Sequence, residues 1–105
     1  MAWTYLFLSG LLEIGWPIGL KMTQNEETKI VGIVVAITFM LASGTMLFLA
    51  QKQIPIGTAY AVWTGIGAAG TFFVGVFFYS DPSSLMRFIG VFLIIAGVAT
   101  LKLSS

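Results

Sequence analysis

A chain of 105 residues with 58% hydrophobic and 9% charged side chains has too little polar surface to cover a water-soluble globule. Its five basic and four acidic residues give a formal charge of +1, which excludes the strongly basic surface of a nucleic-acid-binding protein. The lack of cysteine and histidine removes disulfides, the usual zinc sites and histidine-based catalysis. The composition therefore predicts a membrane protein with no metal and no cofactor.

Four runs are long and apolar enough to cross the hydrocarbon core of ~30 Å as helices, which takes roughly 20 residues each. They cover about residues 3–22, 30–50, 54–79 and 85–103. The connections are only a few residues long and leave no room for a soluble domain. Because open strands leave backbone groups unsatisfied in lipid, and the runs lack the alternation of barrel strands, helices are expected. The sequence predicts an all-α membrane protein, with residues 1–105 forming one domain of four transmembrane helices.

The first run carries a carboxyl group, Glu13, ten residues after Trp3 and nine before Met22. At ~1.5 Å per residue it falls near the middle of the bilayer, where a charge costs about 2.5–3.5 kcal/mol on insertion scales. A carboxyl at this depth is by default functional, and the alternative is a protonated group that bonds a neighbouring helix. Desolvation favours the protonated form and a nearby cation favours the charged form. We therefore expect Glu13 to bind a proton or a cation in competition.

Helical spacing places Ser9, Trp16 and Pro17 beside Glu13. Pro17 removes the hydrogen bond that the Glu13 carbonyl would accept, so a local kink or an exposed carbonyl is expected there. The nearby GxxxG pair at positions 15 and 19 favours close packing against another helix. In the second run, Ser43 is the favoured hydrogen-bond partner of Glu13. Other candidates in that run are Thr38 and Thr45, and each of these hydroxyls can instead bond its own helix backbone.

The third run carries a polar and aromatic stripe at helical spacing, formed by Tyr60, Trp63, Thr64, Gly67 and Thr71. Aromatic faces attract cations and a phenol can donate to a carboxylate, so Tyr60 and Trp63 suit a cationic substrate. Packing is the alternative for both rings. The mid-span glycines, among them Gly65 and Gly67, predict either a hinge for alternating access or close helix packing.

The fourth run contains Gly90 and Gly97, seven residues apart and therefore on one helix face, where they favour close contact between two helices. Four helices with one carboxyl are too few for both halves of a transport pathway, so we expect a dimer. If the chain ends share one side of the membrane, that side holds two basic residues and the other holds three. This small bias predicts insertion in both orientations.

The sequence resembles the small multidrug resistance family of proton-coupled antiporters over essentially its whole length. The resemblance rests on Glu13, on PIGTAYAVWTGIGAAGT at 55–71 and on GVFLIIAGV at 90–98. It implies a multi-pass protein of the bacterial inner membrane that forms an antiparallel, dual-topology homodimer. The two Glu13 side chains would form the shared proton and substrate site, and the fourth helices would form much of the interface.

Within that family, the ExxWxxxLK pattern that includes Trp16 and the WTGIGA segment resemble the guanidinium-exporter branch. The quaternary-ammonium branch commonly has Thr at the first Trp position and Ser after the second. By this resemblance Glu13 would bind guanidinium, while Ser43 and Trp16 would set the hydrogen bonds of its carboxylate. Tyr60 would take part in switching, and Trp63 would help to close the pocket.

The leading hypothesis is an antiporter that moves protons in and guanidinium-class cations out. The alternatives are a broad exporter of quaternary ammonium and multidrug cations, one subunit of a heterodimeric exporter, a non-transporting membrane subunit and a passive channel. Pro17 and the long, acidic TQNEETK connection depart from the family pattern and favour the heterodimer. The near balance of basic residues favours the homodimer. An enzyme is not expected, because a single intramembrane carboxyl supplies little for catalysis.

Overall fold

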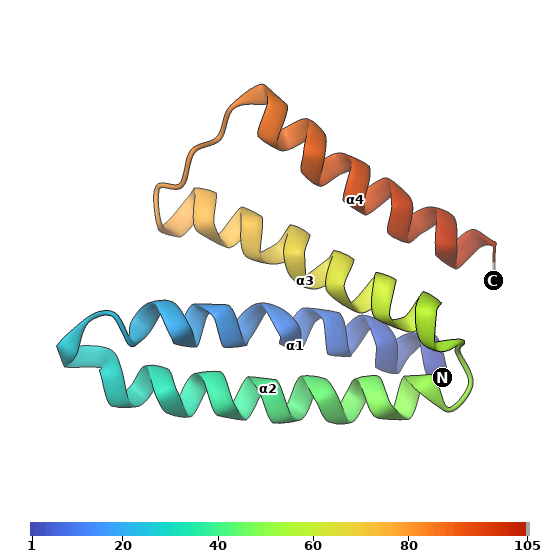
Figure 1. Cartoon of the computed structure of the whole chain (residues 1–105), viewed down its shortest axis with the longest axis horizontal. Coiled ribbons are helices and arrows are strands. Elements are labelled where there is room, and N and C mark those ends of the chain that lie inside the picture. Colours follow the sequence, from blue (N-terminus) through green and yellow to red (C-terminus); the bar gives the residue numbers. More distant parts are fainter. Residues whose placement is uncertain (105) are drawn as a thin grey trace.

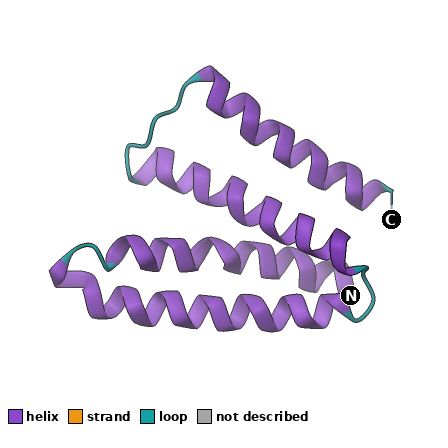
Figure 2. Cartoon of the chain, in the orientation of Figure 1, coloured by secondary structure: helices purple, strands orange, loops and turns teal. Residues whose placement is uncertain are grey.

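Four α-helices joined by short connections make up the protein (Figure 1), whose computed structural model describes residues 1–104. The elements are α1 (Ala2–Met22), η1 (Glu26–Thr28, a 3-10 turn), α2 (Lys29–Gln51), α3 (Ile56–Phe78) and α4 (Leu85–Leu103). Figure 2 shows helix along nearly all of the described chain, with no strand in that part. The all-α membrane fold predicted from the sequence is therefore confirmed.

Three helical segments are long and apolar enough to cross a membrane, namely Glu26–Gln51, Ile56–Phe78 and Leu85–Leu103. Helix α1 is not among them, because its polar and weakly apolar residues, Glu13 and Lys21 included, lower its mean hydropathy. It has 21 residues, which at ~1.5 Å per residue is close to the thickness of the hydrocarbon core. Helix α1 thus matches its neighbours in length but carries polar groups where they are apolar.

Small residues bring α1 and α2 into close contact. A Cβ atom added to Gly19 would lie 2.5 Å from the backbone nitrogen of Ala36, and one added to Gly32 would lie 2.6 Å from the carbonyl oxygen of Gly19. The ring of Phe39 occupies the space that a side chain at Gly15 would need. The packing expected of the GxxxG pair is therefore what the structure shows, with α2 as the partner.

Helix α3 crosses α1 at an angle, so the two helices lie close at one end of the molecule and separate toward the other (Figure 1). At the close end, the start of α1 and the end of α4 lie near a cluster of buried side chains, formed by Ala2, Leu6, Ala50, Ile54, Ala59 and Val62. The opposite end holds the α1–α2 and α3–α4 connections. The divergence of α3 from α1 leaves a groove that opens toward that end.

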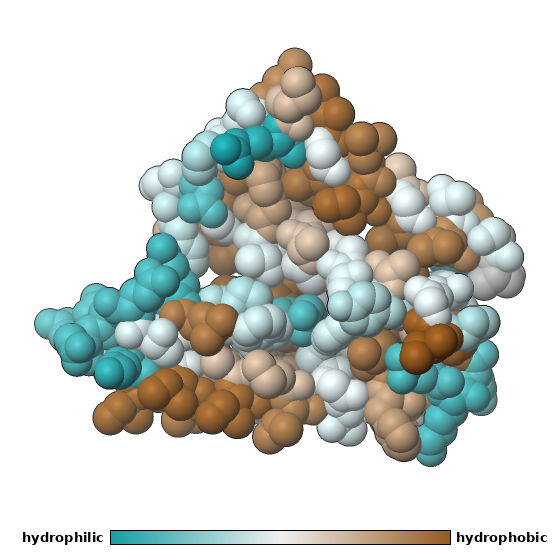
Figure 3. Space-filling view, viewed as in Figure 1, coloured by the Kyte–Doolittle hydropathy of each residue, from teal (hydrophilic) through white to brown (hydrophobic). Residues whose placement is uncertain are grey.

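Helix α4 begins after Ser84, whose hydroxyl accepts a hydrogen bond from the backbone N–H of Arg87 at 3.4 Å. It packs against α3, where Val98 and Ile94 lie over Gly65. Most of its other side chains are exposed in the single chain. Figure 3 shows hydrophobic side chains over α4 and along the outer edge of α2, with hydrophilic ones mainly at the ends of the molecule.

Candidate functional site

Glu13 lines the groove between α1 and α3, which has a volume of about 410 Å³. Its side chain is half-buried and lies near the middle of α1. The other lining residues come from α1, α3 and the α3–α4 connection: Pro17, Thr64, Gly67, Ala68, Thr71, Phe72 and Asp81. The carboxyl group therefore faces a cavity that mixes hydroxyl, apolar and acidic groups, which suits a small organic cation.

Gly67 fixes the side chain of Glu13 against the backbone of α3. A Cβ atom at Gly67 would lie 2.5 Å from the Glu13 Cγ atom, so any larger residue would displace the carboxyl group. Gly65 has a similar role toward α4, because a Cβ atom there would lie 2.6 Å from Cγ2 of Val98. Helix α3 is continuous through both positions. Both glycines thus serve helix packing, and the hinge stays a prediction.

Ser43 joins three helices, but through partners other than the expected one. Its buried hydroxyl donates to the carbonyl oxygen of Ser9 at 2.8 Å and accepts from Nε1 of Trp63 at 2.8 Å. No hydrogen bond from Ser43 to Glu13 occurs in the described chain, which corrects the expectation. The reason is geometric: Ser9 precedes Glu13 by four residues, so α2 reaches the same face of α1 one helical turn away from the carboxyl group. Ser43 thus orients Trp63 directly and Glu13 only through the backbone of α1.

Of the three predicted aromatic residues, Tyr60 and Trp63 contact each other, and none of the three lines the groove. The Tyr60 and Trp63 rings have their centroids 5.5 Å apart with planes tilted by 53°, and Tyr60 is 56% exposed. Trp16 is half-buried in α1 and lines neither the groove nor the hollow described next. The structure therefore brings Tyr60, Trp63 and Ser43 together, and Glu13 with Gly67. The roles of the aromatic residues toward a ligand stay predictions.

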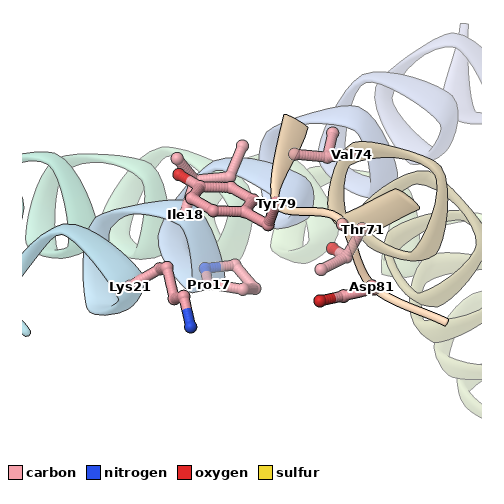
Figure 4. A pocket seen from close by; sticks show the side chains of 8 residues that line it. Pro17, Ile18, Lys21, Thr71, Val74, Tyr79 and Asp81 are labelled. Atoms are coloured by element: carbon pink, nitrogen blue, oxygen red, sulfur yellow. The ribbon is translucent and has the colours of Figure 1, made fainter. Parts of the chain in front are cut away.

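A second hollow, of about 150 Å³, continues the groove toward the end where α1 and α3 diverge (Figure 4). It shares Pro17, Thr71 and Asp81 with the groove and adds Ile18, Lys21, Val74, Gly75 and Tyr79. Sequence reasoning placed Asp81 in a short polar connection and missed it as a lining residue. A possible signal was the Asp-Pro pair, which favours a turn directly after α3.

The glycines predicted for a dimer interface, Gly90 and Gly97, lie on open surface of α4. A Cβ atom added to either would meet no neighbouring atom within 4 Å in the single chain. Neither glycine is therefore needed for packing within the described chain. Their place in an interface between two copies stays a prediction.

Comparison with known proteins relates the chain to a family of membrane exporters. A family model described as Small Multidrug Resistance protein matches residues 1–94. A guanidinium exporter of Proteus vulgaris is 42% identical over 105 residues, covering 100% of both chains. Guanidinium exporters of Yersinia pestis and Salmonella typhimurium are 44% and 43% identical over 105 residues, covering all of this chain and 100% and 99% of theirs.

Proposed function

The chain belongs to the small multidrug resistance family, and from that premise we propose that it exchanges guanidinium-class cations for protons at Glu13. As a family member with bacterial relatives and apolar membrane-crossing helices, it is a multi-pass exporter of the bacterial inner membrane. The observation that carries the proposal is the half-buried Glu13 carboxyl group in the groove between α1 and α3.

Competition at one carboxyl group couples the two fluxes. A protonated Glu13 leaves no charge for a cation, and a bound cation leaves no room for the proton, so each binding event releases the other ligand. The planar guanidinium group can donate two parallel hydrogen bonds to a carboxylate, which a tetraalkylammonium ion cannot do. This geometry, together with the relatives described as guanidinium exporters, supports guanidinium over quaternary cations.

We infer that the working unit is an antiparallel homodimer. One copy supplies one Glu13 and one groove, and most side chains of α4 are exposed apolar residues that need a cover of lipid or protein. Gly90 and Gly97 leave room for a second helix to approach α4. In two copies inserted in opposite directions, the grooves are related by symmetry, so a binding site between them can open to either side of the membrane in turn.

The test is proton movement in liposomes that contain the purified protein and a pH-sensitive dye inside. A guanidinium gradient is expected to drive proton flux in the opposite direction, and a tetraalkylammonium gradient is expected to drive much less. Glu13→Gln should reduce the guanidinium-driven flux to that of empty liposomes. Glu26→Gln, which removes an exposed carboxyl group in η1, should leave it unchanged.

Each alternative outcome would indicate a different function or assembly for this protein. Equal flux with both cations would replace guanidinium export with broad cation export. Proton flux without any added cation would indicate a channel. A persistent flux in Glu13→Gln would overturn the role of the carboxyl group. If wild-type protein gave no flux alone but did so with a related chain, the homodimer would be overturned.

A further inference from the structure

Asp81 is held at the mouth of the groove by its backbone. Ser80 has a φ of 56°, in the left-handed region, which turns the chain back on the end of α3. The Asp81 N–H then donates to the carbonyl oxygen of Gly75 at 3.1 Å. The Asp81 carboxylate occupies the space that a side chain at Gly75 would need. Three separate features thus place one acidic group over the groove.

The cavity around Asp81 is continuous with the cavity around Glu13. Both are lined by Pro17, Thr71 and Asp81, and Glu13 lies farther in than Asp81. Figure 4 shows Lys21 of α1 and Asp81 on opposite sides of the outer hollow, with the Asp81 carboxylate turned toward the α1 side. A cation that leaves water at this end therefore meets the Asp81 carboxylate before it reaches Glu13.

Charges of both signs lie around the outer hollow. Helices α1 and α3 both end here, and the C-terminus of a helix carries a partial negative charge. Nζ of Lys21, which also lines the hollow, lies 5.9 Å from the centroid of the Tyr79 ring, so that ring already has a cationic partner within the chain. The Asp81 carboxylate and the two helix C-termini therefore favour positive charge in the outer hollow, while the Lys21 ammonium on its α1 side opposes it.

We propose that Asp81 is a second cation-binding residue, which takes the guanidinium ion from water at the mouth of the groove before it passes to Glu13. This inference rests on the proposed exchange at Glu13 and deepens it. Asp81 binds the substrate at the mouth of the groove, and Glu13 exchanges it for a proton. In an antiparallel dimer, one Asp81 lies at each side of the membrane, so capture operates in both directions.

The kinetic test is guanidinium uptake by proteoliposomes at low ionic strength. Asp81→Asn keeps the backbone hydrogen bond to Gly75 and the size of the side chain while removing the charge. We expect its KM for guanidinium to rise about fivefold with an unchanged maximal rate, as for loss of one charge contact in water. The matched control is Glu27→Gln, which removes an exposed carboxyl group at the same end but outside the groove.

The dependence of KM on ionic strength distinguishes loss of electrostatic capture from a structural defect in Asp81→Asn. Raising ionic strength from about 0.01 to about 0.15 M shortens the screening length from ~30 to ~8 Å, so the difference between Asp81→Asn and wild type should shrink. A variant that is merely misfolded would keep its defect in salt. Equal KM values for Asp81→Asn and wild type, or an equal rise in Glu27→Gln, would overturn the proposal.

A binding measurement on a variant that does not transport tests this inference independently of the proposed function. In the Glu13→Gln background, guanidinium is expected to shift the backbone amide signals of Gly75 and Asp81 in NMR spectra, and the added Asp81→Asn change should abolish that shift. Absence of the shift in Glu13→Gln would overturn capture at Asp81 even if exchange at Glu13 holds. A shift that persists while Glu13→Gln still exchanges protons would overturn the role of Glu13 and leave Asp81 as the binding residue.

Discussion

The α1–α2 pair and helix α4 are built from the same kinds of residue but use their glycines in opposite ways. In the pair, Gly19 and Gly32 bring two backbones together within the chain. In α4, Gly90 and Gly97 face open surface, and Val91 is the only buried residue of that helix. A small residue in a membrane helix therefore indicates a close approach, but only the fold tells whether the approach lies within one chain or between two.

The different use of glycines indicates different roles for the α1–α2 pair and for helix α4. The α1–α2 pair supplies rigidity, since backbone contact leaves little freedom for the helices to slide. Helix α3 connects the pair to α4 and carries the groove wall opposite Glu13. Helix α4 packs mainly against α3, touches α1 where Lys102 Nζ lies 5.0 Å from the centroid of the Trp3 ring, and presents most of its remaining surface outward. Changes in the pair should therefore affect folding, whereas changes in α4 should affect assembly.

The largest effect is expected for Gly19→Leu. Its side chain would meet the backbone of Gly32 and Ala36, which cannot move aside as a side chain can. We expect a loss of more than about 3 kcal/mol in unfolding free energy, the upper end of overpacking costs. Thermal unfolding in detergent micelles measures this, with Gly44→Leu as the control because a Cβ atom there meets nothing within 4 Å. Equal stability of Gly19→Leu and Gly44→Leu would contradict the role of Gly19 in the packing of α1 against α2.

Gly97→Leu should have a smaller effect, and on association rather than folding. With no neighbour within 4 Å in the single chain, the added side chain leaves unfolding unchanged but obstructs a second helix. We expect dimers to weaken about tenfold, or about 1.4 kcal/mol. Energy transfer between labelled chains in vesicles of varied protein-to-lipid ratio measures the change. Gly57→Leu in α3, also open in the single chain, is the control. Unaltered association would place the interface elsewhere.

A second effect on folding, smaller than that of Gly19→Leu, is expected where α3 joins the pair. Ser43→Ala leaves the Trp63 indole N–H and the Ser9 carbonyl oxygen without their shared partner, at a cost of about 1–3 kcal/mol. Tryptophan fluorescence during unfolding would report the loss. The control is Thr45→Ala, because that exposed hydroxyl bonds only the Leu41 carbonyl of its own helix. A change no larger than the control's would mean that Ser43 does not couple the helices.

Hydropathy and residue type were enough to predict an all-helical membrane fold with a carboxyl group in the middle of its first helix, and the resemblance of the motifs added the family. They were not enough to predict which groups meet, because helical periodicity gives the face of a residue but not the level at which two helices cross. Ser43 lies on the expected side of α2 but meets α1 at Ser9 rather than at Glu13. Asp81 was missed for a related reason, since only the turn at Ser80 brings it back over the groove.

The start of α1 and the end of α4 lie at the same end of the molecule (Figure 1), because an even number of helices returns the chain to its starting side. A gene fusion that joins the last residue of one copy to the first residue of another by a short linker therefore locks the two copies in parallel. Adding one extra membrane-crossing helix to the linker locks them antiparallel. The connectivity of the fold thus allows the relative orientation of two copies to be set by the linker alone.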